Sequence, residues 1–96
     1  MAKVFSTGVS DEGKIREILR QEGYFNIFKW CDRAGARYPT HTHPHYEVRW
    51  ILSGRLVIEE GGRALELKPG DRMESEPDTP HSAYAPQEVC YICGSR

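Results

Sequence analysis

Short apolar runs separated by turn residues are the feature that most limits how this chain can fold. Its 9 glycines and 6 prolines are many for 96 residues, and they fall between apolar runs of only a few residues. Runs of that length are typical of β-strands, and none approaches the length that crosses a membrane. We therefore expect one small all-β domain over residues 1–96, built as a sandwich or closed barrel of short strands.

The apolar runs predict where the strands lie. We expect a strand or arm within residues 1–10 and strands near residues 24–30, 47–52, 55–59, 64–67, 82–85 and 89–92. The glycine pair at 61–62 predicts a hairpin turn.

A single short helix is expected near the N-terminus. Ser10 and Asp11 can cap it, and Ile15, Ile18 and Leu19 form an apolar stripe at helical spacing. A glycine at position 23 ends the pattern. We expect this helix to cover an edge or an end of the β-structure.

The histidines are concentrated in one stretch. His41, His43 and His45 lie within five positions, Glu47 follows, and the remaining histidine is His81. Imidazole and carboxylate groups bind Zn, Mn, Fe, Ni and Cu, so the pattern predicts one divalent transition metal of open identity. His41 and His43 would lie side by side on one strand face. The alternatives are ordinary surface or core histidines and, for His45, an exposed loop position or a role in supporting the ligands.

The spacing resembles the two motifs of the cupin superfamily. The first motif corresponds to Gly35, His41-x-His43, Glu47 and Gly54, and the second to Pro69-Gly70-Asp71 followed by Pro80 and His81. The resemblance implies a small antiparallel jelly-roll barrel with His41, His43, Glu47 and His81 as metal ligands. Residues 47–54 are also similar to acireductone dioxygenases, a family of longer chains.

Arg49 has the strand parity of Glu47, so both would face the barrel interior. A guanidinium there needs an anionic partner, which is either an internal acid such as Glu47 or Glu74, or a substrate carboxylate or enolate. Four aromatic residues are expected to line the interior or fill the core, namely Tyr24, Phe28, Trp30 and Tyr84. Of these, Tyr24, Phe28 and Tyr84 are candidates for substrate contact.

These features favour a metal-dependent enzyme acting on a small anionic or enediol-type molecule, by dioxygenase-like or by isomerase or lyase chemistry. Glu47, if it is a ligand, is not free to act as the base, so the catalytic residue is open. The alternative is a non-catalytic cupin that holds a small ligand such as a sugar or effector, with a structural metal.

The formal net charge of -1 gives no basic footprint for nucleic acid. The first residues lack the apolar core of a signal peptide, so we expect a cytoplasmic protein. An odd number of cysteines, Cys31, Cys90 and Cys93, fits reduced thiols better than disulfides. Cys90 and Cys93 would point to opposite faces of a strand, which argues against a redox pair.

An apolar strand face predicts self-association. Val48, Trp50 and Leu52 would point out of the barrel if Glu47 points in. A small barrel has only its helix, its second sheet or another copy to cover such a face. We expect an isologous homodimer.

Overall fold

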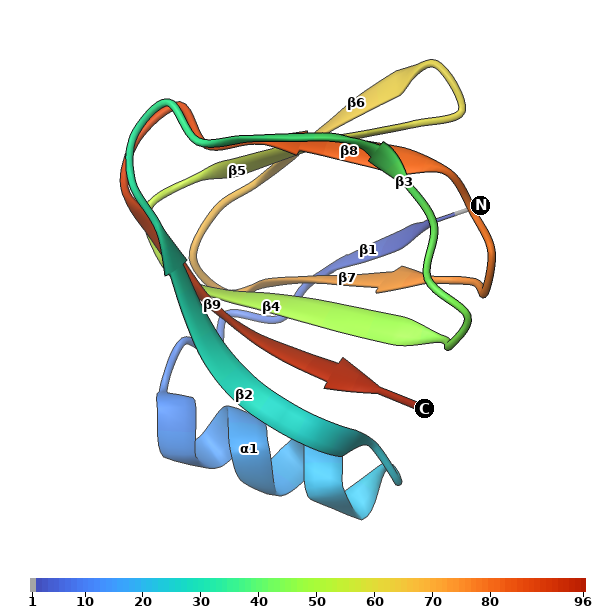
Figure 1. Ribbon diagram of the computed structural model, residues 1–96. Coiled ribbons are helices and arrows are strands. Elements are labelled where there is room, and N and C mark those ends of the chain that lie inside the picture. Colours follow the sequence, from blue (N-terminus) through green and yellow to red (C-terminus); the bar gives the residue numbers. More distant parts are fainter. Residues whose placement is uncertain (1) are drawn as a thin grey trace.

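The computed structural model describes residues 2–96, which fold into two facing antiparallel sheets with one helix outside them (Figure 1). The five-stranded sheet has the order β1-β7-β4-β9-β2, and the four-stranded sheet has the order β3-β8-β5-β6. The strands are β1 (Lys3–Ser6), β2 (Phe25–Asp32), β3 (Arg37–His41), β4 (Glu47–Ser53), β5 (Leu56–Glu60), β6 (Arg63–Leu67), β7 (Asp71–Ser75), β8 (His81–Tyr84) and β9 (Val89–Ser95), and the helix is α1 (Glu12–Gln21). The expected jelly-roll is confirmed.

Strand alternation explains where the main core lies. Along β4 and β5, alternate apolar residues point between the sheets, where they meet residues from β6, β7 and β9. This interior cluster is made mainly of Ile51, Leu56, Ile58, Leu67, Met73, Val89 and Tyr91. Gly61 and Gly62, both with positive φ, form the predicted hairpin turn between β5 and β6.

Helix α1 lies against the outer face of the five-stranded sheet (Figure 1). The Asp11 side chain caps the helix by accepting a hydrogen bond of 2.8 Å from the Lys14 amide. Ile15 and Leu19 are fully buried in a cluster that also contains Tyr24, Val48, Trp50 and Ile92. No helix within residues 2–96 is long and apolar enough to cross a membrane.

This packing removes the reason for which a dimer was expected. Val48 and Trp50 do point out of the barrel, but the helix covers them and leaves Val48 1% and Trp50 2% exposed. Leu52 beside them is half-buried. The homodimer stays a prediction, without support from this face.

The expectation of three reduced cysteines is wrong for two of them. Cys31 on β2 lies directly opposite Cys90 on β9, and a disulfide joins them. Their sequence separation of 59 residues gives no sign of this pairing. Because disulfides are rare in the cytosol, the bond gives the expected cytoplasmic location no support.

The third cysteine, Cys93, keeps a free thiol. Cys93 lies against the interior cluster. Cys90 bonds to Cys31, which shares the outer face of β2 with Lys29, and Lys29 reaches Glu12 of the helix at 3.6 Å. The prediction that Cys90 and Cys93 point to opposite faces is confirmed.

Candidate metal centre

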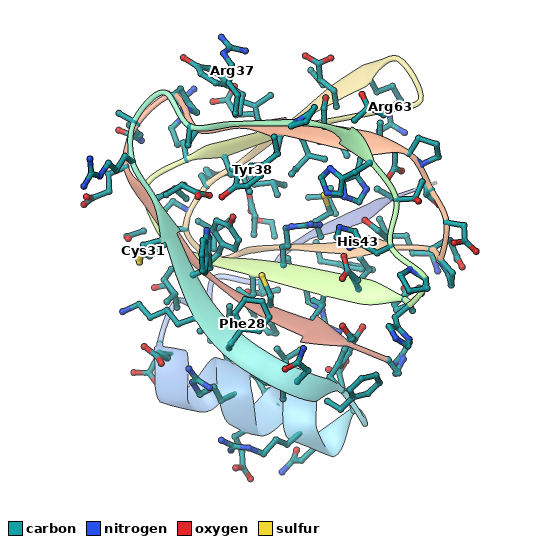
Figure 2. The ribbon with its side chains drawn as sticks, in the orientation of Figure 1. Phe28, Cys31, Arg37, Tyr38, His43 and Arg63 are labelled. Atoms are coloured by element: carbon teal, nitrogen blue, oxygen red, sulfur yellow. A yellow bond between two sulfur atoms is a disulfide. The ribbon has the colours of Figure 1, made fainter. Side chains whose placement is uncertain are left out.

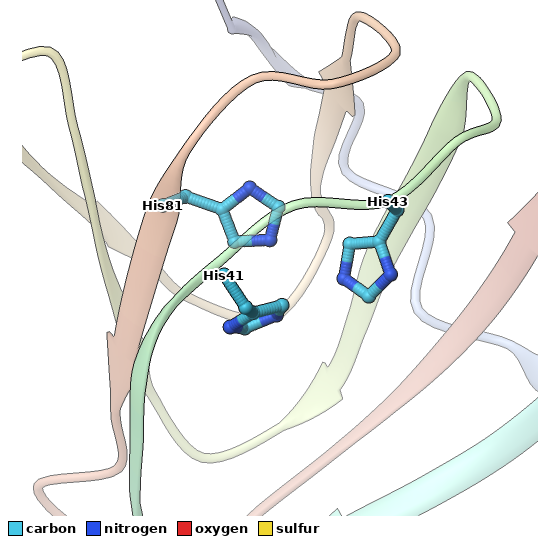
Figure 3. Close-up of side chains that lie close together, drawn as sticks. All are labelled: His41, His43 and His81. Atoms are coloured by element: carbon cyan, nitrogen blue, oxygen red, sulfur yellow. The ribbon is translucent and has the colours of Figure 1, made fainter.

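Three histidines meet at one end of the four-stranded sheet. His41 ends β3, His81 begins β8, and the pairing of these strands sets the two residues opposite each other. His43 follows two residues after the end of β3 and turns its ring toward them (Figure 3). The ring centroids of His41 lie 4.7 Å from those of both His43 and His81. One possible ligand atom from each histidine lies within 4.8 Å of the others, so the structure brings together three of the four predicted ligands.

The hydrogen bonds of these rings leave nitrogen atoms available for a metal. Nδ1 of His41 lies 2.7 Å from the Pro39 carbonyl. A carbonyl only accepts, so Nδ1 carries the proton and Nε2 keeps its lone pair. Nε2 of His43 and both ring nitrogens of His81 are buried without a hydrogen bond. Buried unpaired nitrogens are costly, and a bound metal would satisfy them.

The electrostatic surroundings favour the neutral form of the His43 and His81 imidazoles. Burial, followed by the positive charge of Arg49, lowers the pKa of His81 to about 4. Burial also lowers the pKa of His43, although the nearby Glu47 carboxylate acts in the opposite direction. Since only a neutral imidazole can donate a lone pair to a metal, these residues fit a metal centre.

Glu47, the first residue of β4, lies beside the three histidines. Its Oε1 atom is 3.4 Å from Nε2 of His43 and 3.7 Å from the Arg49 guanidinium. The distance between Glu47 and His43 is within ion-pair range, but Nε2 of His43 makes no hydrogen bond. The contact between Glu47 and Arg49 matches the expectation that an internal acid such as Glu47 is a partner of Arg49. The role of Glu47 as fourth ligand stays a prediction.

A cavity of about 320 Å³ opens next to the histidines. This is the size that takes a small molecule. Figure 2 shows Phe28, Tyr38 and His43 directed into the space between the sheets. The cavity is lined by Phe28, Trp30, Tyr38, His41, His43, Arg49, Ala83, Tyr91 and Cys93. The sequence prediction that Phe28 and Arg49 face the same space as the histidines agrees with this placement.

Three other predicted site residues lie elsewhere. Tyr24 is buried in the cluster beneath α1. Tyr84 pairs with Val57 and lies beneath the Arg37 guanidinium, 4.2 Å from its ring centroid, outside the histidine cavity. His45 is exposed, with its ring edge-on to Phe25 at 5.4 Å. Their positions do not support the predicted contacts of Tyr24 and Tyr84 with a ligand, or of His45 with the metal ligands.

Sequence reasoning missed four residues around the cavity. Tyr38, Tyr91 and Cys93 line it, and the buried Asp32 accepts hydrogen bonds from both tyrosines. The strand expected near residues 24–30 stops short of Asp32, but β2 continues through it. Its parity with Phe28 and Trp30 was the signal that would have identified it.

Three comparisons place the chain among known proteins. The family model described as Cupin domain matches residues 28–93. A comparison with curated proteins finds no significant match. Solved structures with the same fold are numerous.

Two of these structures are 26% identical to the chain. The DMSP lyase DddQ from Ruegeria pomeroyi has a TM-score of 0.68, over 73% of this chain and 36% of that one. An RmlC-like cupin from Shewanella frigidimarina has a TM-score of 0.66, over 72% of this chain and 63% of that one. This chain therefore spans less than two thirds of either protein.

A cupin superfamily protein from Desulfitobacterium hafniense extends the similarity over nearly the whole chain. It has a TM-score of 0.70 and 12% identity, over 99% of this chain and 76% of that one. The family match itself includes all three histidines and every residue that lines the cavity. The chain belongs to the cupin family.

Proposed function

We propose that this cupin is a metal-dependent enzyme that acts on a small organic anion inside its barrel. The observation that carries the proposal is that predicted metal ligands and a partly buried arginine line one cavity. His41, His43 and Arg49 all line the same cavity of about 320 Å³. An anion bound there would lie beside both the guanidinium and the metal ligands.

Arg49 is suited to hold the anion. Its side chain is only 14% exposed. Within residues 2–96 its acidic contact is the one with Glu47 at 3.7 Å, which is too long for a hydrogen bond. Its N–H groups are therefore free to donate to a carboxylate, and a guanidinium can do so through two parallel bonds. This would orient the substrate toward the histidines.

His41, His43 and His81, with Glu47 as the predicted fourth ligand, would hold the metal. When bound, a divalent transition metal supplies Lewis acidity, and Fe or Mn adds the chemistry of oxygen. The remaining cavity residues are weak proton acceptors near neutral pH. Burial raises the pKa of the Cys93 thiol to about 11, and burial and the hydrogen bond to Asp32 raise the pKa of Tyr91.

The shortage of bases favours a reaction whose difficult step depends on the metal. Dioxygenase-like cleavage is of that kind. A lyase is the other reaction we propose for this site, and the similarity to a DMSP lyase supports it. A lyase would require a proton acceptor, and Glu47 is the carboxylate at the histidines that would fill this role if the three histidines hold the metal without it.

Metal exchange tests this proposal. The protein would be loaded with Fe(II), Mn(II) or Zn(II) and offered a panel of small hydroxy- and keto-carboxylates, while oxygen uptake, product and binding are measured. For a dioxygenase-like reaction we expect oxygen-dependent turnover with Fe or Mn and binding without turnover with Zn, whereas a lyase, which needs only Lewis acidity, should turn over with Zn as well and consume no oxygen.

Two variants complete the experiment. The double variant His41→Ala/His81→Ala should lose both metal and turnover, whereas His45→Ala, which changes an exposed histidine away from the group, should keep both. Equal binding with every metal and turnover with none would instead indicate a barrel that only binds its ligand.

A further inference from the structure

Asp32 is a buried carboxylate held entirely by aromatic residues of the cavity wall. Its side chain lies at the end of β2, and the residue is 7% exposed. The Tyr91 hydroxyl donates to Oδ2 at 2.7 Å, and the Trp30 indole N–H donates to Oδ1 at 2.9 Å. The Tyr38 hydroxyl also donates to Oδ1. We call Trp30, Tyr38 and Tyr91 the aromatic wall.

The charge of Asp32 is not neutralised by a basic partner. Across residues 2–96, no lysine, arginine or histidine forms an ion pair with it, and all three of its hydrogen-bond donors are neutral groups. A hydroxyl or indole N–H that donates to a carboxylate becomes more electron-rich, which strengthens the negative face of its ring. The aromatic wall therefore gives its side of the cavity a negative potential.

The strand registers set this wall apart from the histidines and Arg49. On β9, Cys93 pairs with both Arg49 and Phe28, whereas Tyr91, two residues earlier, pairs with Trp30. Two residues along a strand correspond to about 7 Å. On the facing sheet, His41 pairs with His81 while Tyr38 pairs further along β8 with Ala83. Both sheets thus place the histidines toward one end of the cavity and the aromatic wall toward the other.

We propose that the cavity binds a small zwitterion, with its carboxylate at Arg49 beside the histidines and a quaternary or other bulky cationic group against the aromatic wall. The carboxylate end of this inference rests on the proposed function. Aromatic rings at a partly closed site hold such cations through the attraction of the ring face. The cation does not contact Asp32, whose carboxylate fixes the rings and adds to their negative potential.

A pair of isosteric ligands gives the direct test. One compound carries a trimethylammonium group joined to a carboxylate by three methylene groups. In the other, a tert-butyl group of the same shape replaces the trimethylammonium group. Binding to the metal-loaded protein would be measured by calorimetry. We expect the zwitterion to bind about threefold to tenfold more tightly than its uncharged-head isostere, from the usual strength of cation–π contacts at a partly exposed site.

Variants assign the preference to the aromatic wall. Asp32→Asn keeps an acceptor oxygen but removes the charge, and should lose most of the preference. Asp71→Asn is the matched control, because Asp71 is likewise buried at 4% exposure but accepts its hydrogen bond from the Lys68 amide, outside the cavity. Trp30→Leu, at a position 49% exposed, removes a ring without opening the core and should also lose the preference.

The outcomes separate this inference from the proposed function. If the isostere binds as tightly as the zwitterion while metal is retained, the proposed anion site at Arg49 is supported and the proposed cation site at the aromatic wall is contradicted. If Asp71→Asn reduces the preference as much as Asp32→Asn, the assignment to Asp32 is overturned. If neither compound binds and no metal is held, both proposals fall.

Discussion

Nδ1 of His41 lies 2.7 Å from the carbonyl oxygen of Pro39, two residues earlier in the chain. This contact fixes which nitrogen of the ring faces a metal. Because Nδ1 must carry the proton, Nε2 would be the ligand atom of a bound metal. The hydrogen bond is local, so it orients the ring before any metal arrives.

The assignment of Nε2 makes the two amide substitutions at this position unequal. A glutamine oxygen reaches about as far as Nε2, whereas an asparagine oxygen reaches only to Nδ1. We expect His41→Gln to retain part of the metal and His41→Asn to bind it at least about tenfold more weakly than the parent protein, since even outer partners of ligands cost that much. Elemental analysis after dialysis measures this, with His45→Asn as the control. Better retention by His41→Asn would reverse the assignment.

Glu47→Gln separates the two roles that the structure leaves to Glu47. If it is the fourth ligand, the neutral amide should lower metal affinity about tenfold or more, and metal content should fall after dialysis. Glu66→Gln, an exposed acid whose side chain is 59% accessible and pairs with Arg55, is the control and should bind metal normally. Full metal content with lost turnover would show that Glu47 accepts a proton instead.

Local spacing was enough to predict the histidine group and the helix. The closeness of His41 and His43 in the chain and the stripe of Ile15 and Leu19 are local features, although His43 lies beyond the end of β3 and not on the strand face that its parity predicted. The distant His81 came from the resemblance to the second cupin motif. The structure brings this third histidine opposite His41 through strand pairing.

Backbone irregularities defeated the same reasoning elsewhere. Tyr24 and Phe28 share strand parity, but the β2 register shifts between residues 25 and 28, where Asn26 has a φ of 53°. This bulge sends Tyr24 under the helix and Phe28 into the cavity. A shift in β3 between Tyr38 and His41 has the opposite effect, because it brings residues of different parity to one cavity. Bulges of this kind leave no periodic signal in a sequence.

The disulfide was unpredictable for a different reason. Cys31 and Cys90 are brought together by the pairing of β2 with β9, which is a long-range property of the fold. With three cysteines, composition favoured free thiols. The same strand pairing sets Trp30 opposite Tyr91, so the aromatic wall also depends on a long-range contact and could not be predicted from the sequence.

Thiol counting tests the disulfide. Protein unfolded without reductant should show one reactive thiol per chain, that of Cys93, and three after reduction. Reduction should lower the free energy of unfolding by roughly 2–4 kcal/mol, because the bond closes a long loop. Cys93→Ser should show no thiol before reduction. Three thiols without reductant would contradict the bond between Cys31 and Cys90.

Cys93 should react slowly in the folded protein. Burial raises the pKa of its thiol to about 11, well above the ordinary value. Since only the thiolate reacts, alkylation by iodoacetamide at about pH 8 should be at least a hundredfold slower than that of free cysteine. A rate equal to that of free cysteine would show that the thiol is exposed and unperturbed.

The raised pKa of the Cys93 thiol also makes the free energy of unfolding depend on pH. Above its ordinary pKa of about 8.5, the Cys93 thiol of the unfolded chain loses its proton while the folded protein keeps it. The unfolded state then binds fewer protons, so the contribution of Cys93 to stability falls as the pH rises from about 8.5 toward 11. Urea unfolding across this range should show a smaller decline in Cys93→Ala. An identical decline in both proteins would contradict the perturbed thiol.

A comparison of Gly54 with Gly62 separates two reasons for a glycine, a positive φ and a close approach of the main chain. Both have a φ of 77°, so alanine is strained equally at each by the backbone alone. They differ in their surroundings. A Cβ atom at Gly54 would lie 1.9 Å from the Glu88 carbonyl oxygen, whereas nothing lies within 4 Å of one at Gly62. Gly54 thus lets the end of β4 pass close to the segment that enters β9.

Gly62→Ala should therefore cost about 1 kcal/mol in the free energy of unfolding, the usual penalty for a left-handed alanine. Gly54→Ala should cost about 3 kcal/mol or more beyond that, because the main chain before Val89 would have to move. Urea unfolding of both variants measures the difference. Since Val89 pairs with Asp32, such a shift should also reduce the preference for the zwitterionic ligand if Gly54→Ala still folds. Equal losses of stability in the two variants would show that only backbone strain, and not the contact with Glu88, requires a glycine at position 54.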